Sequence, residues 1–367
     1  MAKKELSVEE KIKLIKSFAE EIISEDELKE LFNSKKKIIA YDGFEPSGQI
    51  HIAQGLLRAI TVNKIVSTGI NFRFWVADWF AMLNNKLGGD LEKIQVVGEY
   101  FIEVWKACGL KEAIEKEKVE FIWASEFIKK HPEYWETVLK LSKEATIQRV
   151  MRCGQIMGRE ESTSNPSAQI LYPLMQAADI HHLNADIAQL GMDQRKVNML
   201  ARDLFPKIGL KSPVAIHHHM LLGLQFKESN LEGIDRKIAM KMSKSRPETA
   251  IFMTDTTEDV KRKFKNAYCP EGQVEDNPVL EYAKYIVFEK VDKIIVERPE
   301  KFGGNLTFNS YEELEATFKE KKLHPMDLKS AVAKYIDSLL EPVRKHFETD
   351  KKAKELLAKV RSFEITR

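Results

Sequence analysis

Cysteine is scarce in this chain of 367 residues, which contains only Cys108, Cys153 and Cys269. The three are far apart and form no Cys-x-x-Cys pair, so we expect no disulfide framework. An excess of charge of one sign is also missing, because 58 Lys and Arg stand against 56 Asp and Glu, for a net charge of +2. The chain therefore carries no overall basic signal for nucleic acid, and any RNA contact has to come from local patches.

Long hydrophobic runs and a secretory signal are also absent from the sequence. The most apolar stretch, residues 72–83, carries Arg73 and Asp78 and is too short to cross a bilayer. The N-terminus, Met1 to Glu5, is charged and has no apolar signal region. We therefore expect a cytoplasmic enzyme with ample core and no membrane contact.

Strand-like runs alternate with helical periodicity through the first two thirds of the chain. Strands are expected at 37–42, 70–77, 119–124, 186–190 and 213–219, and helices at 51–68, 91–108, 132–160, 173–183 and 193–204. This alternation predicts an α/β fold with a Rossmann-like parallel sheet and helices on both of its faces. We predict N-terminal helices over 1–35, begun by capping boxes at Ser7 and Ser24, a catalytic domain over 36–250 and an all-α C-terminal domain over 251–367.

The most informative segment is Lys241-Met242-Ser243-Lys244-Ser245. Its two lysines can bring two ammonium groups to a leaving polyphosphate, although an ordinary surface loop can have the same composition. A second motif supports the phosphate interpretation. The turn Gly43–Gly48 precedes a helix that opens at His51, and a helix N-terminus offers N–H groups and a positive dipole end to a phosphate. His51 and Gln54 can both donate hydrogen bonds there, but Gln54 cannot carry charge.

A polar stripe marks the predicted helix that begins near Pro173. Tyr172, Gln176 and Asp179 are four and three residues apart, so they share one face of an otherwise apolar helix. A hydrogen-bond network between helices is the alternative to a binding site. The run His217-His218-His219 does not predict a metal site, because neighbours on a strand point to opposite faces. We expect no metal ion bound by protein ligands.

Taken together, these motifs resemble the tyrosyl-tRNA synthetases of the archaeal/eukaryotic branch, which are class I aminoacyl-tRNA synthetases. The class consensus His-Ile-Gly-His reads His51-Ile-Ala-Gln54 here, as in this branch. The resemblance covers nearly all of the chain after about residue 36. It is carried by Tyr41–Gly48, Phe74–Phe80, Tyr172–Asp179, Gly191–Val197 and Lys241–Ser245.

The resemblance implies a two-step reaction and a role for each matching residue. L-tyrosine and Mg·ATP would give tyrosyl-adenylate and pyrophosphate, and tRNA(Tyr) would then accept the tyrosine. Tyr41 and Asp179 would bind the phenol, and Tyr172, Gln176 and Gln194 the α-amino group. His51, Gln54, Lys241 and Lys244 would be catalytic. The nucleotide would also contact Gly43, Phe44, Glu45, Ser47, Gly48, Met242, Ser243 and Ser245, and tRNA would contact Arg152, Arg195 and Lys196. The C-terminal domain would bind the anticodon, and the family implies a homodimer.

Three alternatives remain at this point. A small-molecule nucleotidylyltransferase shares a phosphate turn that contains histidine but would not need the C-terminal helical domain. A tryptophanyl-tRNA synthetase shares the fold and both signature loops but has no use for a phenol-binding pair. A catalytically inactive, synthetase-derived RNA-binding protein would not need His51, Lys241 and Lys244 intact. Phenylalanine would leave Tyr41 and Asp179 buried without partners. Tyrosyl-tRNA synthetase is the known example of this penalty, and the conclusion that no editing site is needed is taken from it.

Overall fold

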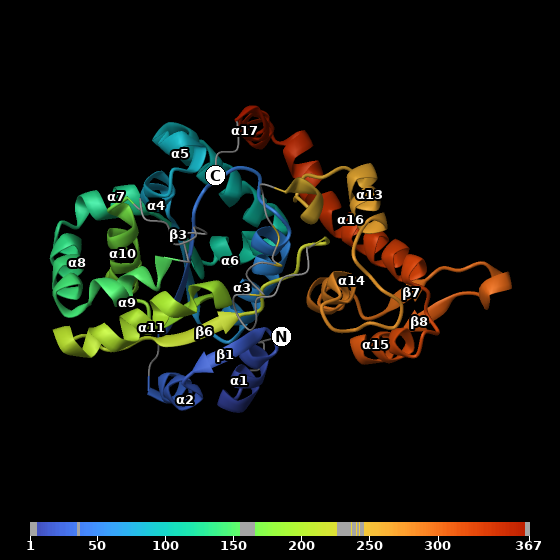
Figure 1. Cartoon of the computed structure of the whole chain (residues 1–367), viewed down its shortest axis with the longest axis horizontal. Coiled ribbons are helices and arrows are strands. Elements are labelled where there is room, and N and C mark those ends of the chain that lie inside the picture. Colours follow the sequence, from blue (N-terminus) through green and yellow to red (C-terminus); the bar gives the residue numbers. More distant parts are fainter. Residues whose placement is uncertain are drawn as a thin grey trace.

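A six-stranded sheet forms the centre of the N-terminal two thirds (Figure 1). The structure, a computed structural model, describes residues 6–34, 37–154, 166–225, 236, 240, 242 and 246–363. The strand order is β1-β6-β5-β2-β3-β4. The strands are β1 (Ala19–Ile23), β2 (Ile39–Phe44), β3 (Asn71–Val76), β4 (Val119–Trp123), β5 (Ile187–Gly191) and β6 (Val214–His218). Strands β2 to β6 are mutually parallel, which confirms the predicted α/β class.

The N-terminal segment contributes more than the two predicted helices. Both helices are present, α1 (Val8–Lys16) with its capping box at Ser7 and α2 (Glu25–Ser34). Between them lies β1, which the sequence analysis missed and which pairs antiparallel with β6, Ile22 opposite Ile216. The sequence Ala-Glu-Glu-Ile-Ile has no period-two alternation, so it gives no strand signal.

Helices cover both faces of the sheet. They are α3 (Arg58–Ser67), α4 (Asp78–Leu83), α5 (Leu91–Trp105), α6 (Lys111–Glu115), α7 (Ala124–Lys130), α8 (Glu133–Glu144), α9 (Ile147–Met151), α10 (Ala168–His182) and α11 (Arg195–Leu204). Short turns of helix lie at Ala53–Leu57, Lys86–Gly89, Lys106–Leu110, Met192–Gln194, Phe205–Ile208, Pro247–Thr249, Ala283–Val287 and Glu300–Phe302. Helix α10 begins five residues before Pro173, so the proline lies inside the helix and not near its start as predicted. At this inner position proline has no N–H to donate, and one backbone hydrogen bond of the helix is missing.

The C-terminal part lies beside the sheet domain and is mainly helical (Figure 1). Its helices are α13 (Thr257–Lys265), α14 (Pro278–Tyr282), α15 (Tyr311–Lys319), α16 (Pro325–Thr349) and α17 (Lys351–Ser362). The all-α prediction needs one correction, because β7 (Ile294–Val296) and β8 (Leu306–Phe308) form a small antiparallel sheet. Three-residue strands are too short to give a recognisable sequence pattern. Helix α17 returns to the sheet domain and contacts α5.

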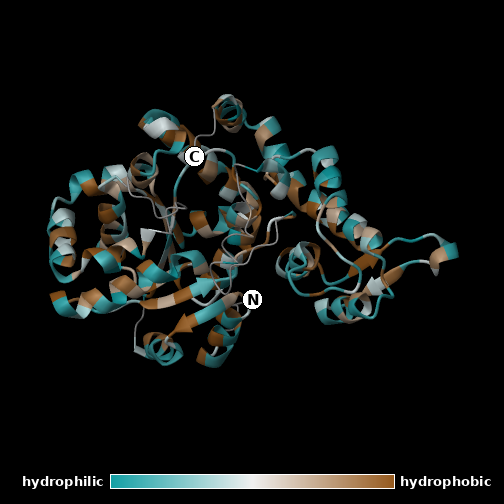
Figure 2. Cartoon of the chain, viewed as in Figure 1, coloured by the Kyte–Doolittle hydropathy of each residue, from teal (hydrophilic) through white to brown (hydrophobic). Residues whose placement is uncertain are grey.

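Two apolar cores lie within the described residues. One runs from α1 across one side of the sheet into α16 and α17, so it joins the C-terminal part to the sheet. The other is confined to residues 41–205 and packs α8, α10 and α11 against the sheet. Apolar and polar stripes alternate on the helices that cover both cores (Figure 2). No helix among the described residues is long and apolar enough to cross a membrane.

Candidate active site

The deepest polar groups of the site come from β2 and α10. Tyr41 is only 1% exposed, and its hydroxyl has no hydrogen-bond partner among the described residues. Asp179 is also 1% exposed and accepts a hydrogen bond from the Tyr134 hydroxyl at 2.7 Å. A buried polar group without a partner costs free energy, so an unpaired phenol next to a carboxyl group indicates a place for a polar ligand atom.

Electrostatics links Tyr41 and Asp179. Burial raises the pKa of the Asp179 carboxyl well above its ordinary value, more than the hydrogen bond from Tyr134 lowers it. Burial also raises the pKa of the Tyr41 phenol, and the nearby Asp179 charge raises it further. The structure thus brings these two predicted residues together in one dry environment, suited to hydrogen bonding with a neutral hydroxyl.

The polar stripe of α10 continues from Asp179 toward Gln194. Tyr172, Gln176 and Asp179 are all buried on the same face, as predicted from their spacing. The Gln176 side-chain amide donates to Gln194 Oε1 at 3.1 Å, and Gln194 lies just before α11. The Tyr172 hydroxyl donates to Glu45 Oε1 at 2.5 Å. Burial raises the pKa of the Tyr172 phenol, and Glu45, Asp179 and Tyr41 raise it further, so Tyr172 lies close to the Tyr41–Asp179 pair.

The side chain of Glu45, which is predicted to contact the nucleotide, accepts the hydrogen bond from Tyr172. Besides Tyr172, it accepts from Asn84 Nδ2, which lies 3.1 Å from both carboxylate oxygens. Phe44, also predicted on the nucleotide side, packs its ring against Trp105 at 5.1 Å between ring centroids. Phe44 is the last residue of β2 and Glu45 follows it, and the two side chains pack against different partners.

Residues 49–55, here called the phosphate turn, carry His51 and Gln54. Gly48, just before it, has φ +111°, a conformation that favours glycine. The turn was expected to offer free backbone N–H groups, but the N–H of Ile52 donates to Ile251 O at 2.8 Å. The Gln54 backbone carbonyl accepts a hydrogen bond from Trp105 Nε1 at 2.8 Å. The buried side-chain oxygen of Gln54, Oε1, has no partner among the described residues. The helix start is therefore fixed by two distant segments.

Of the predicted phosphate loop Lys241–Ser245, the structure describes Met242. Its side chain is 5% exposed, and the Tyr282 hydroxyl donates to its sulfur at 3.6 Å. Lys241, Ser243, Lys244 and Ser245 lie outside the described residues. The described part of this loop is thus anchored in the core shared with the C-terminal helices.

The three residues predicted to contact tRNA lie near the N-terminal end of α11 and after α9. Arg195 Nε donates to Glu21 Oε2 of β1 at 2.8 Å. Arg152 is exposed, and Lys196 is half-buried. Because β1 was not predicted, the intramolecular ion pair of Arg195 could not be foreseen.

The three consecutive histidines separate as the strand geometry predicts. His217 Nδ1 lies 2.8 Å from Glu21 Oε2, and His218 Nδ1 lies 2.9 Å from the Gln189 side-chain amide. His219 is paired with Glu20 and Glu281. Among the described residues, no group of three or more His, Cys, Asp or Glu side chains is arranged to hold a metal ion.

Tyr134 is a site residue that sequence reasoning missed. It lies on the buried face of α8 with Val138 and Leu141, a pattern that predicts core packing. Its hydroxyl lies within hydrogen-bond distance of Asp179 Oδ1 and of Met175 O, at 2.8 Å from the latter, so it holds the Asp179 carboxyl group against α8. No signal in a single sequence distinguishes such a tyrosine from an ordinary core residue.

Comparison with known proteins agrees with this geometry. A family model described as tRNA synthetases class I (W and Y) matches residues 33–341. The chain is 52% identical over 361 residues to "Tyrosine--tRNA ligase 2, cytoplasmic" of Arabidopsis thaliana, an alignment that covers 98% of this chain and 46% of that protein. The chain thus spans about half the length of this relative.

Solved structures give the same result. The tyrosyl-tRNA synthetase of Leishmania major in complex with tyrosinol has a TM-score of 0.88 and 44% identity, over 98% of this chain and 61% of that one. The enzyme of Pyrococcus horikoshii complexed with L-tyrosine has a TM-score of 0.87 and 40% identity, over 96% of this chain and 100% of that one. The chain therefore belongs to the class I tRNA synthetases, in the family of the tryptophan and tyrosine enzymes, and the resemblance to tyrosyl-tRNA synthetases indicated by its motifs is confirmed.

Proposed function

We propose that the chain is a tyrosine–tRNA ligase that activates L-tyrosine with ATP and transfers it to the 3′ end of tRNA(Tyr). The observation that carries the proposal is the buried Tyr41 hydroxyl, which has no partner among the described residues and lies close to Asp179. A substrate phenol fits this pair, because it can donate to the carboxyl group and accept from Tyr41. Gln176, Gln194 and Tyr172 would bind its α-amino group.

Activation requires no covalent intermediate on the enzyme. The tyrosine carboxylate attacks the α-phosphate of Mg·ATP, the bond to the β-phosphate breaks, and pyrophosphate leaves. Catalysis consists of positioning and of stabilising the charge on the transferring group. His51 and Gln54 would donate to the phosphates from the phosphate turn, and Lys241 and Lys244 would face the departing pyrophosphate. The magnesium ion would enter the site with ATP, as part of the nucleotide substrate.

The remaining nucleotide contacts would come from the two signature segments. We assign the turn residues Gly43, Ser47 and Gly48 and the loop residues Met242, Ser243 and Ser245 to this role. We assign Glu45 and Phe44 to this role as well, although their side chains contact Tyr172 and Trp105.

The tRNA would lie across both halves of the chain. We propose the division into residues 1–35, 36–250 and 251–367, with the last part meeting the anticodon. Arg152, Arg195 and Lys196 would meet the acceptor stem, where a guanidinium group can contact guanine with two hydrogen bonds. For Arg195 this contact would require it to exchange its partner Glu21 for the nucleic acid.

We further propose a homodimer and a cytoplasmic location. The location follows the names of the plant relatives. The dimer is supported by exposed large apolar side chains on helices that contact one another, α8, α9 and α10. They are Trp135, Leu139, Ile147 and Leu171. Large apolar side chains that are exposed on neighbouring helices favour a protein interface.

ATP–pyrophosphate exchange tests the proposed function directly. The purified chain is assayed with tyrosine, with tryptophan, with phenylalanine and with no amino acid. We expect exchange that depends on tyrosine alone. Exchange that depends on tryptophan would instead identify a tryptophanyl-tRNA synthetase. No exchange with any amino acid, from a folded protein that still binds tRNA, would identify an inactive RNA-binding relative.

A further inference from the structure

We propose that Lys263, a residue of the C-terminal helix α13, is a positioning residue for tyrosine activation. It would act by holding residues 250–255, here called the bridging segment, against the phosphate turn. This inference rests on the proposed function. It makes the C-terminal part a component of the ATP site even when no tRNA is present.

Lys263 is unusual because its charge is buried. The residue is 3% exposed, and its ammonium group donates to Ala250 O at 2.9 Å and to Asp255 Oδ2 at 2.6 Å. The ammonium nitrogen also lies 4.9 Å from the centroid of the Phe252 ring. A buried lysine is rare and has to be paired. All three contacts are to the bridging segment, so the charge fixes both ends and the middle of that segment.

The bridging segment is in turn paired with the phosphate turn. Ile52 N donates to Ile251 O at 2.8 Å, and Met253 N donates to Ile50 O at 3.0 Å, on either side of a β-bridge between His51 and Phe252. His51, the proposed phosphate ligand, therefore has its backbone held from both sides. A displacement of the bridging segment would displace His51 with it.

Side chains reinforce this pairing. A Cβ atom added at Gly55 would lie 2.5 Å from Met253 Cγ, so glycine lets the buried Met253 pack directly on the start of the helix. The Thr254 hydroxyl donates to Gln49 Oε1 at 3.3 Å. These contacts leave little freedom for the phosphate turn to move independently of the bridging segment.

Two arginines of the last helices contact the same segment. Arg344 Nη1 of α16 donates to Asp255 O at 3.1 Å, and Arg361 Nη2 of α17 donates to Thr254 O at 3.2 Å. The segment also follows Lys241–Ser245 in the sequence within five residues. It thus joins the two proposed phosphate-binding elements to each other and to the C-terminal helices.

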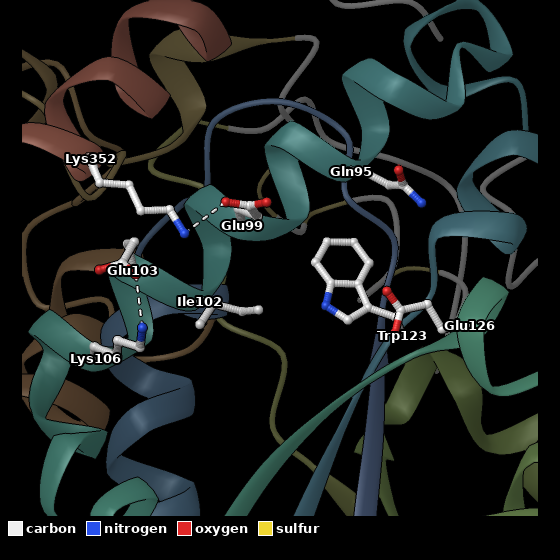
Figure 3. A pocket seen from close by; sticks show the side chains of 8 residues that line it. All are labelled: Gln95, Glu99, Ile102, Glu103, Lys106, Trp123, Glu126 and Lys352. Atoms are coloured by element: carbon white, nitrogen blue, oxygen red, sulfur yellow. Dashed lines mark hydrogen bonds and ion pairs between the residues drawn. The ribbon is translucent and has the colours of Figure 1, made fainter.

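A second connection runs through α5, whose Trp105 donates to the Gln54 carbonyl. Figure 3 shows the outer face of α5, where Lys352 of α17 pairs with Glu99 at 3.0 Å and Lys106 with Glu103 at 2.8 Å, around a pocket of about 360 Å³. His346 Nε2 of α16 lies 3.0 Å from Glu103 Oε2. The Lys352–Glu99 pair is exposed, and the partners of the more buried Glu103 are partly exposed, so we assign the positioning role to Lys263, whose charge is buried.

The test compares Lys263→Met with Lys334→Met in tRNA-free pyrophosphate exchange. Lys334 is an exposed lysine of the C-terminal part that pairs with Glu297 at 2.7 Å, so it controls for loss of an ion pair there. For Lys263→Met we expect kcat/KM for ATP to fall about 10- to 100-fold, the effect of misplacing a reacting group by a fraction of an ångström to 1 Å. The KM for tyrosine should stay within about twofold. Lys263→Arg, which keeps the charge, should recover part of the loss, and Lys334→Met should match the wild type.

Several outcomes would overturn the proposal. If Lys263→Met folds and keeps the wild-type kcat/KM for ATP, Lys263 is not a positioning residue. If kcat/KM falls equally for ATP and for tyrosine, Lys263 has only a structural role. If Lys263→Met does not fold, Arg361→Gln serves instead, because Arg361 is exposed and loses a single hydrogen bond. It should raise the ATP KM about 2- to 10-fold, and an unchanged value would reject the proposal. A wild-type protein without tyrosine-dependent exchange would show that the proposed function, and not this inference, is wrong.

Discussion

The amino-acid side and the phosphate side of the site are built differently. Tyr41 belongs to the core confined to residues 41–205, and Asp179 accepts its hydrogen bond from Tyr134 of the same core. The residues around His51, by contrast, pack into the core that continues through the C-terminal helices. Successive residues of β2 point to different cores: Tyr41 to the core confined to residues 41–205, and Ala40 to the core that reaches the C-terminal helices.

This difference separates recognition from chemistry. The amino-acid pocket needs fixed geometry, because discrimination between tyrosine and phenylalanine depends on buried groups that cannot reorient. The phosphate side has to bring together the turn after β2 and the loop before residue 246, which are far apart in the sequence. A shared core with the C-terminal helices gives that side its rigidity. Variants on the two sides should therefore affect different kinetic parameters.

The largest effect is expected from Lys244→Ala on the phosphate side. Removing one group that stabilises transition-state charge costs roughly 10²- to 10³-fold in rate. We therefore expect kcat for pyrophosphate exchange to fall by that factor, with little change in tyrosine affinity, measured as the KM for tyrosine. Exchange at the wild-type rate in this variant would show that Lys244 is not catalytic.

On the amino-acid side, Tyr41→Phe should give the opposite pattern. The substrate phenol would lose one partner in a buried site, which costs about 1–3 kcal/mol, or about 5- to 150-fold in kcat/KM for tyrosine. The KM for ATP should not change. The control is Tyr285→Phe, since Tyr285 stacks on His219 outside the proposed site. Equal effects on ATP and tyrosine would contradict the separation of the two sides.

The parts that sequence patterns predicted are those that depend on local periodicity. The β2 to β6 strands and the shared face of Tyr172, Gln176 and Asp179 followed from spacing alone. The missed parts depend on contacts distant in sequence. Strand β1 forms because it has β6 as a partner, and Tyr134 becomes a site residue because α8 packs on α10. No local pattern encodes either relation.

The same limit applies within the site. The side chains of the turn at Gly43–Gly48 have different partners, because packing directs Phe44 to an aromatic cluster and Glu45 to Tyr172. The expectation of free N–H groups at the helix start assumed an isolated helix. The bridging segment, which no motif identified, occupies one of them.

A glycine substitution tests the coupling across the phosphate side. Gly55→Ala would place a Cβ 2.5 Å from Met253 Cγ, and overpacking of this kind costs about 1–3 kcal/mol of stability. We expect a lower unfolding free energy by urea denaturation and a higher ATP KM, with the tyrosine KM unchanged. The double variant Gly55→Ala/Met253→Ala should lose less than the sum of the two single losses, because the second change removes the clashing atoms. Additive losses would mean that the two residues are not coupled.

The smallest effect is expected at His219, whose side chain connects the sheet domain to the C-terminal part. Burial disfavours its charge, but Glu20 of β1 and Glu281 of α14 outweigh burial and raise the pKa of His219 to about 9. A raised pKa means that the charged histidine stabilises the fold fully below pH about 6.5 and that this stabilisation is lost as the pH rises toward 9.

We therefore expect the unfolding free energy of the wild type to decrease by on the order of 1 kcal/mol between pH 6.5 and 9, since solvent partly screens both carboxylates. In His219→Gln this decrease should be absent, and the variant should be less stable than the wild type at pH 6.5 but similar to it near pH 9. Urea denaturation at three pH values measures both curves. The tyrosine KM should stay the same throughout, because His219 belongs to neither the amino-acid pocket nor its core; a shift in that KM would show that the pocket does depend on the C-terminal part.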